Sequence, residues 1–121
     1  MCIDAGKPYK GSKKKVFVVW KACSIKDGKL HAMCGWYTPD NEPVILPIGK
    51  YTKARLYSTK KDFGWHACGD RDSAYNAWYP DAIVRCKVRG VISRNKWGDV
   101  RSEWMYISKR DAAKALKEAK R

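Results

Sequence analysis

The clearest pattern of apolar and polar residues lies between Ala82 and Gly90. Apolar residues alternate there with three cations, namely Arg85, Lys87 and Arg89. Successive side chains of a β-strand point to opposite faces, so the pattern predicts a strand over 82–92 with one face toward a core and a basic face outside. Residues two apart on a strand are separated by about 6.6 Å, the scale of successive phosphates in an extended nucleic-acid strand.

A second strand is expected over 101–107, after a turn around 95–99, so that the two strands form a hairpin. Val88 opposite Met105 and Cys86 opposite Ile107 would bury the apolar residues of both strands on one face. A shift by one residue would bury the cations, and the hydrophobic pattern therefore specifies the register.

The same register fills the outer face of the hairpin with cations and aromatic rings. Arg89 lies across from Trp104, and Lys87 lies across from Tyr106. Rings can stack on bases or on guanidinium groups, and cations can follow phosphates. A solvated sheet face, on which Arg and Lys side chains merely cover the rings, remains an alternative. A helix that covers this face is a further alternative.

The remaining strands are expected over 16–23, 30–37, 44–51 and 63–68. The strand over 44–51 can only be a short edge strand, because it contains Pro47 and Gly49. Residues 1–14 are polar and rich in Gly, Pro and Lys, which indicates a flexible arm or a loop at the start of one domain spanning 1–121.

Two helices complete the prediction. Asp70 can cap a short helix over 71–79 that Pro80 ends. Ser108 and Asp111 form a capping-box pattern at the start of a C-terminal helix over 109–120. The expected fold class is α+β: a mostly antiparallel sheet of five to six strands, with the short central helix and the C-terminal helix on one side of it.

Charge gives the strongest indication of the partner. The 121 residues carry 26 Lys and Arg against 12 Asp and Glu, a net charge of +14. Six Trp and seven Tyr indicate a folded domain and not a disordered basic tail. Such a charge attracts polyanions at long range, so we expect nucleic acid, RNA or DNA, or a nucleoprotein complex. The candidate nucleic-acid contacts are Lys53, Arg55, Arg85, Lys87, Arg89, Arg94, Lys96, Trp97, Arg101, Trp104 and Tyr106.

The sequence indicates no cofactor and no metal. Five cysteines without a CxxC pair are typical of reduced, buried thiols in a cytoplasmic protein. His31 with Cys34 and His66 with Cys68 could supply zinc ligands, but their spacings are unlike those of zinc knuckles. Apolar stretches are too short to cross a membrane, so no membrane partner is expected.

Motifs of catalysis are missing as well. The sequence contains no P-loop, nucleophile elbow or glycine-rich dinucleotide loop. We therefore assign no catalytic residue and favour a binding protein over an enzyme. A protein that uses the same basic face against an acidic protein surface is the first alternative. The oligomeric state stays open.

Three short segments, 20–22, 64–68 and 84–88, are similar to segments of small, uncharacterised phage-encoded proteins, whose signature is a Gly-aromatic-His-Ala stretch. The resemblance implies an inhibitor of a bacterial defence complex, such as an anti-CRISPR protein, acting in the host cytoplasm. Some proteins of this pattern look like remote relatives of ADP-ribosyltransferases. That resemblance implies a second alternative, a nucleotide-modifying enzyme centred on His66, for which Glu103 is the available acidic partner.

Overall fold

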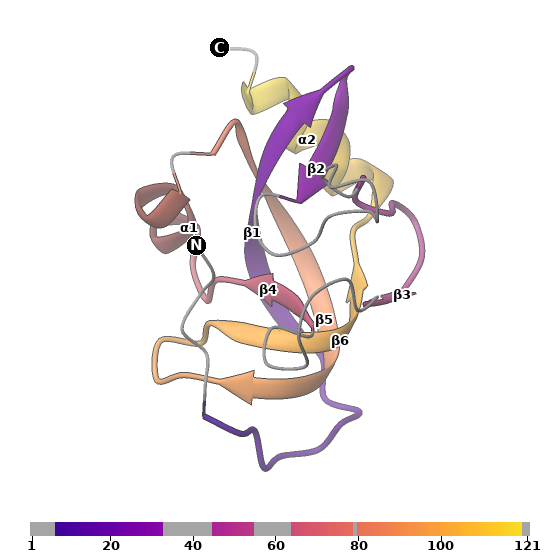
Figure 1. Ribbon diagram of the computed structural model, residues 1–121. Coiled ribbons are helices and arrows are strands. Elements are labelled where there is room, and N and C mark those ends of the chain that lie inside the picture. Colours follow the sequence, from indigo (N-terminus) through magenta and orange to yellow (C-terminus); the bar gives the residue numbers. More distant parts are fainter. Residues whose placement is uncertain (1–6, 33–44, 55–63, 79, 120–121) are drawn as a thin grey trace, which may run out of the picture.

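The computed structural model describes residues 7–32, 45–54, 64–78 and 80–119, with the backbone alone for 75–78. It is an α+β fold, as predicted, built on a curled antiparallel sheet (Figure 1). In chain order the elements are β1 (Phe17–Lys26), β2 (Lys29–Ala32), β3 (Thr52–Lys53), β4 (Trp65–Ala67), α1 (Arg71–Trp78), β5 (Ala82–Arg94), β6 (Val100–Tyr106) and α2 (Lys109–Ala119).

The sheet curls far enough to close on itself. Its strand order is β2-β1-β5-β6-β3, and β4 pairs with β6. Directly after β4, Cys68 pairs with Trp20 of β1 through two N–H···O hydrogen bonds of 2.8 Å. Strands β1, β5, β6 and β4 therefore form a ring of hydrogen-bonded neighbours, and Figure 1 shows β4 crossing in front of the strands.

The predicted register of the β5–β6 hairpin is confirmed. Val88 pairs with Met105, Arg89 with Trp104 and Lys87 with Tyr106. The strand pairing ends at Lys87 and Tyr106, and the next residues, Cys86 and Ile107, are both buried in the core beyond it.

Gly90 changes the course of β5. Strict alternation would place Val88 and Val91 on opposite faces, yet both are buried in one core. Between them Gly90 has a φ of +63°, a conformation that glycine adopts without a steric penalty. A register shift between Val91 and Ser93 follows, and such bulges increase the local twist. The part of the hairpin beyond Gly90 is thereby turned away from β1, whose pairing with β5 ends at Val88.

Several predicted elements differ at their ends. Strand β2 covers 29–32, and residues 33–37 of the predicted strand lie outside the described residues. Within 45–51 the backbone makes only a single bridge, from Ile45 to His31, in place of the predicted edge strand. Gly49 has a φ of +88° there, which is incompatible with an extended strand. The two-residue β3 follows instead.

Residues 7–13, which the sequence predicts as an arm or a loop, run along β5 as a loop. Tyr9 N donates to Ile92 O, Arg94 N to Lys7 O and Gly90 N to Lys13 O. The Tyr9 ring packs against the core.

Both helices begin at the predicted caps. Asp70 accepts a hydrogen bond from Ser73 N at 2.8 Å, which lowers the pKa of the Asp70 carboxyl. Ser108 Oγ accepts from Asp111 N at 3.0 Å and donates to the Asp111 carboxylate at 2.9 Å. The first turn of each helix thus has donors satisfied by a side chain.

The expectation that both helices share one side of the sheet is wrong. Ala74 of α1 packs with Ile83 and Trp20, whereas Ala112 and Ala115 of α2 belong to the main core with Val84. Ile83 and Val84 are neighbours on β5 and face opposite sides. The two helices therefore cover opposite faces of β5: α1 covers the face of Ile83, and α2 covers the face of Val84.

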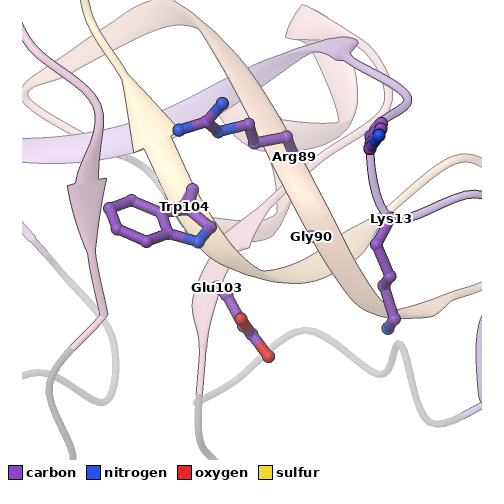
Figure 2. Close-up of a pocket in the computed structure, with 6 residues that line it drawn as sticks. Lys13, Arg89, Gly90, Glu103 and Trp104 are labelled. Atoms are coloured by element: carbon purple, nitrogen blue, oxygen red, sulfur yellow. The ribbon is translucent and has the colours of Figure 1, made fainter.

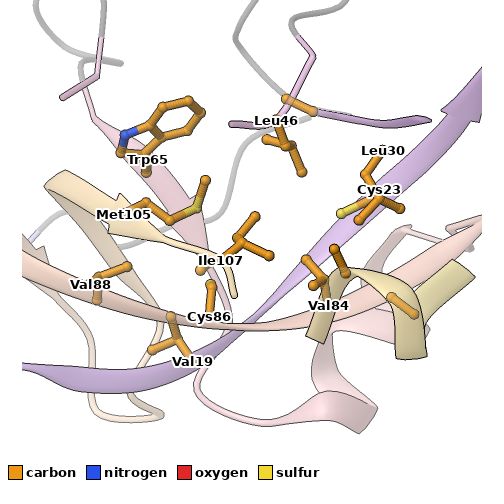
Figure 3. Close-up of a cluster of buried hydrophobic side chains, with 14 of the residues drawn as sticks. Val19, Cys23, Leu30, Leu46, Trp65, Val84, Cys86, Val88, Met105 and Ile107 are labelled. Carbon is orange, nitrogen blue, oxygen red and sulfur yellow. The ribbon is translucent and has the colours of Figure 1, made fainter. Parts of the chain in front are cut away.

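The main core lies inside the curl (Figure 3). Its side chains come from every described strand except β3 and from α2, and the fully buried ones include Val19, Val84, Val88, Met105 and Ile107. Lys21 is also buried, at 3% exposure, and its ammonium donates to His66 O at 2.6 Å. A buried ammonium requires such an acceptor, so this hydrogen bond ties β1 to β4 from inside the ring.

Two buried thiols should make stability sensitive to alkaline pH. Burial raises the pKa of Cys23 and of Cys86 from 9.0 to about 12, although the charge of Lys21 acts in the opposite direction. A thiol whose pKa is higher in the folded state stabilises it fully below pH 9.0, and this contribution is lost as the pH rises toward 12. We expect the free energy of unfolding to fall across this range.

Urea unfolding of the wild type, Cys23→Ala and Cys86→Ala at a series of pH values checks this prediction. Each variant should show a shallower decline than the wild type, because it lacks one of the two thiols whose pKa burial raises. Parallel declines would show that the thiols are not responsible.

Candidate nucleic-acid interface

The outer face of the hairpin carries the candidate site. We call the following residues the basic face: Lys53, Arg85, Lys87, Arg89, Trp104 and Tyr106. Arg85, Lys87 and Arg89 point away from the core because the alternating residues of β5 are buried. Across three strands, Arg89 pairs with Trp104 and Trp104 with Lys53. The register that buries the core thus aligns cations and rings from three strands on one surface.

Arg89 is held between aromatic rings. Its guanidinium carbon lies 4.4 Å from the ring centroid of Tyr51 and 5.3 Å from that of Trp104. Tyr51 in turn lies 5.3 Å from Tyr106, centroid to centroid. A guanidinium stacked on a ring is fixed in orientation while its in-plane N–H groups still point outward. Tyr51 was not among the predicted contacts, because its position beside β5 depends on the pairing of β3 with β6.

A cavity of about 500 Å³ adjoins Arg89 and Trp104 (Figure 2). Lys13, Lys14, Gly90 and Glu103 complete its lining. Lys13 Nζ donates to Val91 O at 2.7 Å, so its ammonium is fixed beside β5. The loop over 7–13 therefore adds positive charge to this end of the basic face, which the sequence alone did not indicate.

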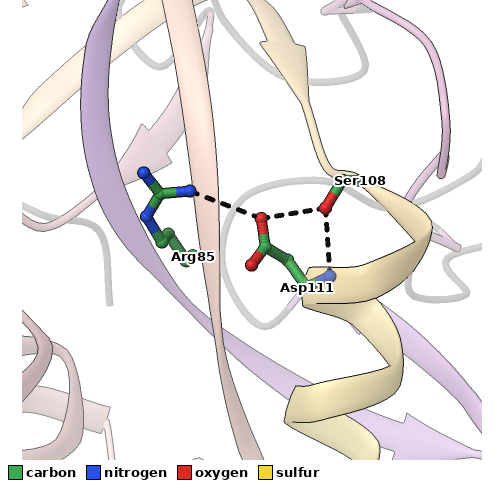
Figure 4. A network of polar contacts seen from close by, with 3 residues as sticks. All are labelled: Arg85, Ser108 and Asp111. Atoms are coloured by element: carbon green, nitrogen blue, oxygen red, sulfur yellow. Dashed lines mark hydrogen bonds and ion pairs between the residues drawn. The ribbon is translucent and has the colours of Figure 1, made fainter.

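A second cavity, of about 400 Å³, lies at the other end of the row, between β5 and the start of α2. Arg85, Lys87, Arg110 and Lys114 line it together with Tyr106, Ser108 and Asp111. Figure 4 shows the Asp111 carboxylate between Ser108 and Arg85, whose Nη1 is 3.6 Å from it. A cavity thus adjoins each end of the row.

Helix α1 covers only one end of this sheet face. Its Ala74 packs on Ile83 and Trp20, next to Arg85. Beyond that contact Lys87 and Arg89 are exposed, as is Val18, which pairs with Lys87 from β1. Among the described helices, α1 thus covers this face at the Ile83 end, and Lys87 and Arg89 lie beyond the helix.

Two of the predicted contacts at the hairpin tip, Arg94 and Arg101, do not join the basic face. Arg94 stacks on Phe17, with 4.5 Å from its guanidinium carbon to the ring centroid. Arg101 Nε donates to the buried Ser93 Oγ at 3.0 Å. Arg94 and Arg101 lie beyond the turn of β5 at Gly90 and the register shift that follows it, so they no longer share a face with Arg85, Lys87 and Arg89. For Arg94 and Arg101 the structure therefore differs from the prediction that the tip extends the same surface.

The tip nevertheless presents an exposed aromatic side chain. Trp97 is 65% exposed, and the ammonium of Lys96 lies 4.6 Å from the centroid of its ring. Gly69 packs directly beneath the tip, and a Cβ there would collide with Trp97 O. Of the remaining predicted contacts, Arg55 lies outside the described residues.

Both histidines are buried, His31 at 7% and His66 at 3% exposure. The described part of the chain holds no group of three or more His, Cys, Asp or Glu placed to bind a metal. Cys34 lies outside that part. Nor does any helix within the described ranges have the length and apolar character that crossing a membrane requires.

Comparisons of the chain with protein-family models, with curated proteins and with solved structures found no match. The resemblance to phage-encoded proteins therefore stays a prediction.

The turn at Gly90 generates a testable prediction about this surface. A Cβ at Gly90 would lie 3.3 Å from Glu103 Cβ and from Trp104 Cδ1, in addition to the strain of its positive φ. We expect Gly90→Ala to lower the free energy of unfolding by more than the ~1–2 kcal/mol that a positive φ costs a residue with a Cβ.

Gly28→Ala is the matched control, since Gly28 has a φ of +73° with nothing within 4 Å of its Cβ position. It should cost the φ strain alone in a urea titration. Equal losses for the two variants would show that β5 and β6 do not approach as closely as described.

Proposed function

We propose that this chain is a nucleic-acid-binding protein that contacts RNA or DNA, free or within a nucleoprotein complex, through the basic face. The observation that carries the proposal is the row of Arg85, Lys87 and Arg89 with so little compensating charge. In the described part of the chain, Asp111 is the single carboxylate within 4 Å of any of the three. Uncompensated cations aligned along one strand favour a polyanion that is itself extended.

Electrostatics supplies most of the expected affinity. Each phosphate that a Lys or Arg neutralises releases counterions, so affinity falls linearly on a logarithmic salt scale. Trp104 and Tyr106 add surfaces on which bases can stack, at about 1–3 kcal/mol per base. Arg89 is already oriented by Tyr51 and Trp104, so less conformational entropy is lost when it meets a phosphate. These contacts suit single strands, whose bases are accessible.

An acidic protein partner is the alternative that a specific observation favours. Val16 and Val18 on the β1 side of the row are 46% and 45% exposed. Exposed apolar residues beside cations are common in protein interfaces. An enzyme centred on His66 has less support, because the ring is buried.

The test is a salt titration of binding to a fluorescent single-stranded RNA and a matched DNA duplex. We compare R85Q/K87Q/R89Q with K10Q/K29Q/K117Q, which removes the same number of charges from exposed positions outside the basic face. The first variant should bind more weakly, and its plot of log affinity against log salt should lose about 0.7–0.9 of slope per lost contact. Circular dichroism checks that both fold.

Two results would contradict the proposal. Equal losses in the two variants would show that net charge alone, and not the basic face, attracts nucleic acid. A partner captured from a bacterial lysate that survives nuclease treatment would favour the acidic protein.

A further inference from the structure

We infer that the cavity between β5 and α2 binds the terminal phosphate of a nucleic-acid strand, a phosphomonoester dianion. This inference rests on the proposed function, and it names the group that the basic face receives at one of its ends. The cavity of about 400 Å³ has room for a phosphate with part of its sugar.

Positive charge converges on this cavity from two elements. Arg85 and Lys87 come from β5, and Arg110 and Lys114 come from α2. Both pairs place like charges close together, two residues apart on a strand and four apart on a helix. Such pairs are repulsive, and an anion between them relieves the repulsion. Of these four cations, only Arg85 has a carboxylate within 4 Å among the described residues.

Asp111 does not cancel this charge. Its carboxylate accepts from Ser108 Oγ and lies 3.6 Å from Arg85, so it is engaged by the cap and by one guanidinium nitrogen. Four cations against one carboxylate leave an excess of three positive charges around the cavity. Ser108 Oγ already accepts from Asp111 N, so the cationic side chains supply the attraction for an anion.

The shape of the cavity favours the end of a strand over its interior. Tyr106 ends β6 and Ser108 precedes α2, so the link between the two elements forms part of the cavity wall. A strand that follows Arg89 and Lys87 toward Arg85 reaches the end of the row, because α1 covers Ile83 beyond it. A terminal phosphomonoester also carries more charge than an internal phosphodiester. Both properties match an excess of cations at the end of the row.

The experiment compares three single-stranded oligonucleotides of one sequence: with a 5′-phosphate, with a 3′-phosphate, and with hydroxyls at both ends. Charge-assisted hydrogen bonds are worth about 1.5–3 kcal/mol each, so we expect one phosphorylated end to bind about 10- to 100-fold more tightly than the hydroxyl form. Millimolar inorganic phosphate should reduce that preference.

Variants assign the preference to the cavity. R110Q/K114Q should lose the preference, while its affinity for the hydroxyl oligonucleotide should fall no further than that of a variant with two other α2 charges removed. K109Q/K117Q removes equal charge from α2 outside the cavity and should keep the preference. Both pairs are on the helix surface, and circular dichroism checks that α2 is retained.

The outcomes separate this inference from the proposed function. Equal binding of all three oligonucleotides would overturn the inference and leave the proposed function intact. A preference that persists in R110Q/K114Q would also overturn it, by placing the phosphate elsewhere. Failure to bind any of the three would overturn both.

Discussion

The pairing of Trp20 with Cys68 is the contact on which the rest of the structure depends. Two backbone hydrogen bonds there join β4, already paired with β6, to β1. The closure turns an open sheet into a ring whose interior can be filled by the side chains of a small chain. Lys21 reinforces it from inside through its hydrogen bond to His66 O. Helix α1 begins shortly after Cys68, so the same closure holds α1 over Ile83. The outer face of β5 is exposed only beyond this contact, at Lys87 and Arg89.

Strand β5 has to satisfy two opposing demands. One face contributes apolar side chains to the core, and the other carries a row of cations that repel one another. The row is bounded on both sides by structure: α1 covers Ile83 before it, and Gly90 turns the strand after it. Within those bounds Arg89 is stabilised by Tyr51 and Trp104, and Arg85 by Asp111. The middle cation, Lys87, pairs across the strands with Tyr106 and has no carboxylate within 4 Å in the described residues. The charge is therefore least compensated at the centre of the surface.

Much of this could be predicted from the sequence, because the deciding interactions are local or periodic. Alternation fixed the register of β5 and β6, and a capping residue located the start of each helix. The closure could not be predicted, since nothing in the sequence around Cys68 distinguishes a residue that bridges to β1. A single glycine at position 90 redirected the hairpin tip, which separated Arg94 and Arg101 from the residues that precede them. Tyr51 reached the basic face through a two-residue strand, too short to leave a periodic signal. Long-range pairing and the local conformation of one glycine thus account for these differences.

Three buried cysteines make local opening of the fold measurable by thiol labelling. Cys68 lies at the closure, while Cys23 and Cys86 lie in the ring interior, and all three are buried. A thiol reagent reaches each one only in molecules that have opened at that place, so the rate of labelling measures the free energy of that opening. Labelling of Cys68 ahead of the other two would mean that β4 detaches from β1 while the core stays intact. Simultaneous labelling would mean that ring and core open as one unit. The order of modification, read by mass spectrometry, would thereby give the hierarchy of stability within the fold.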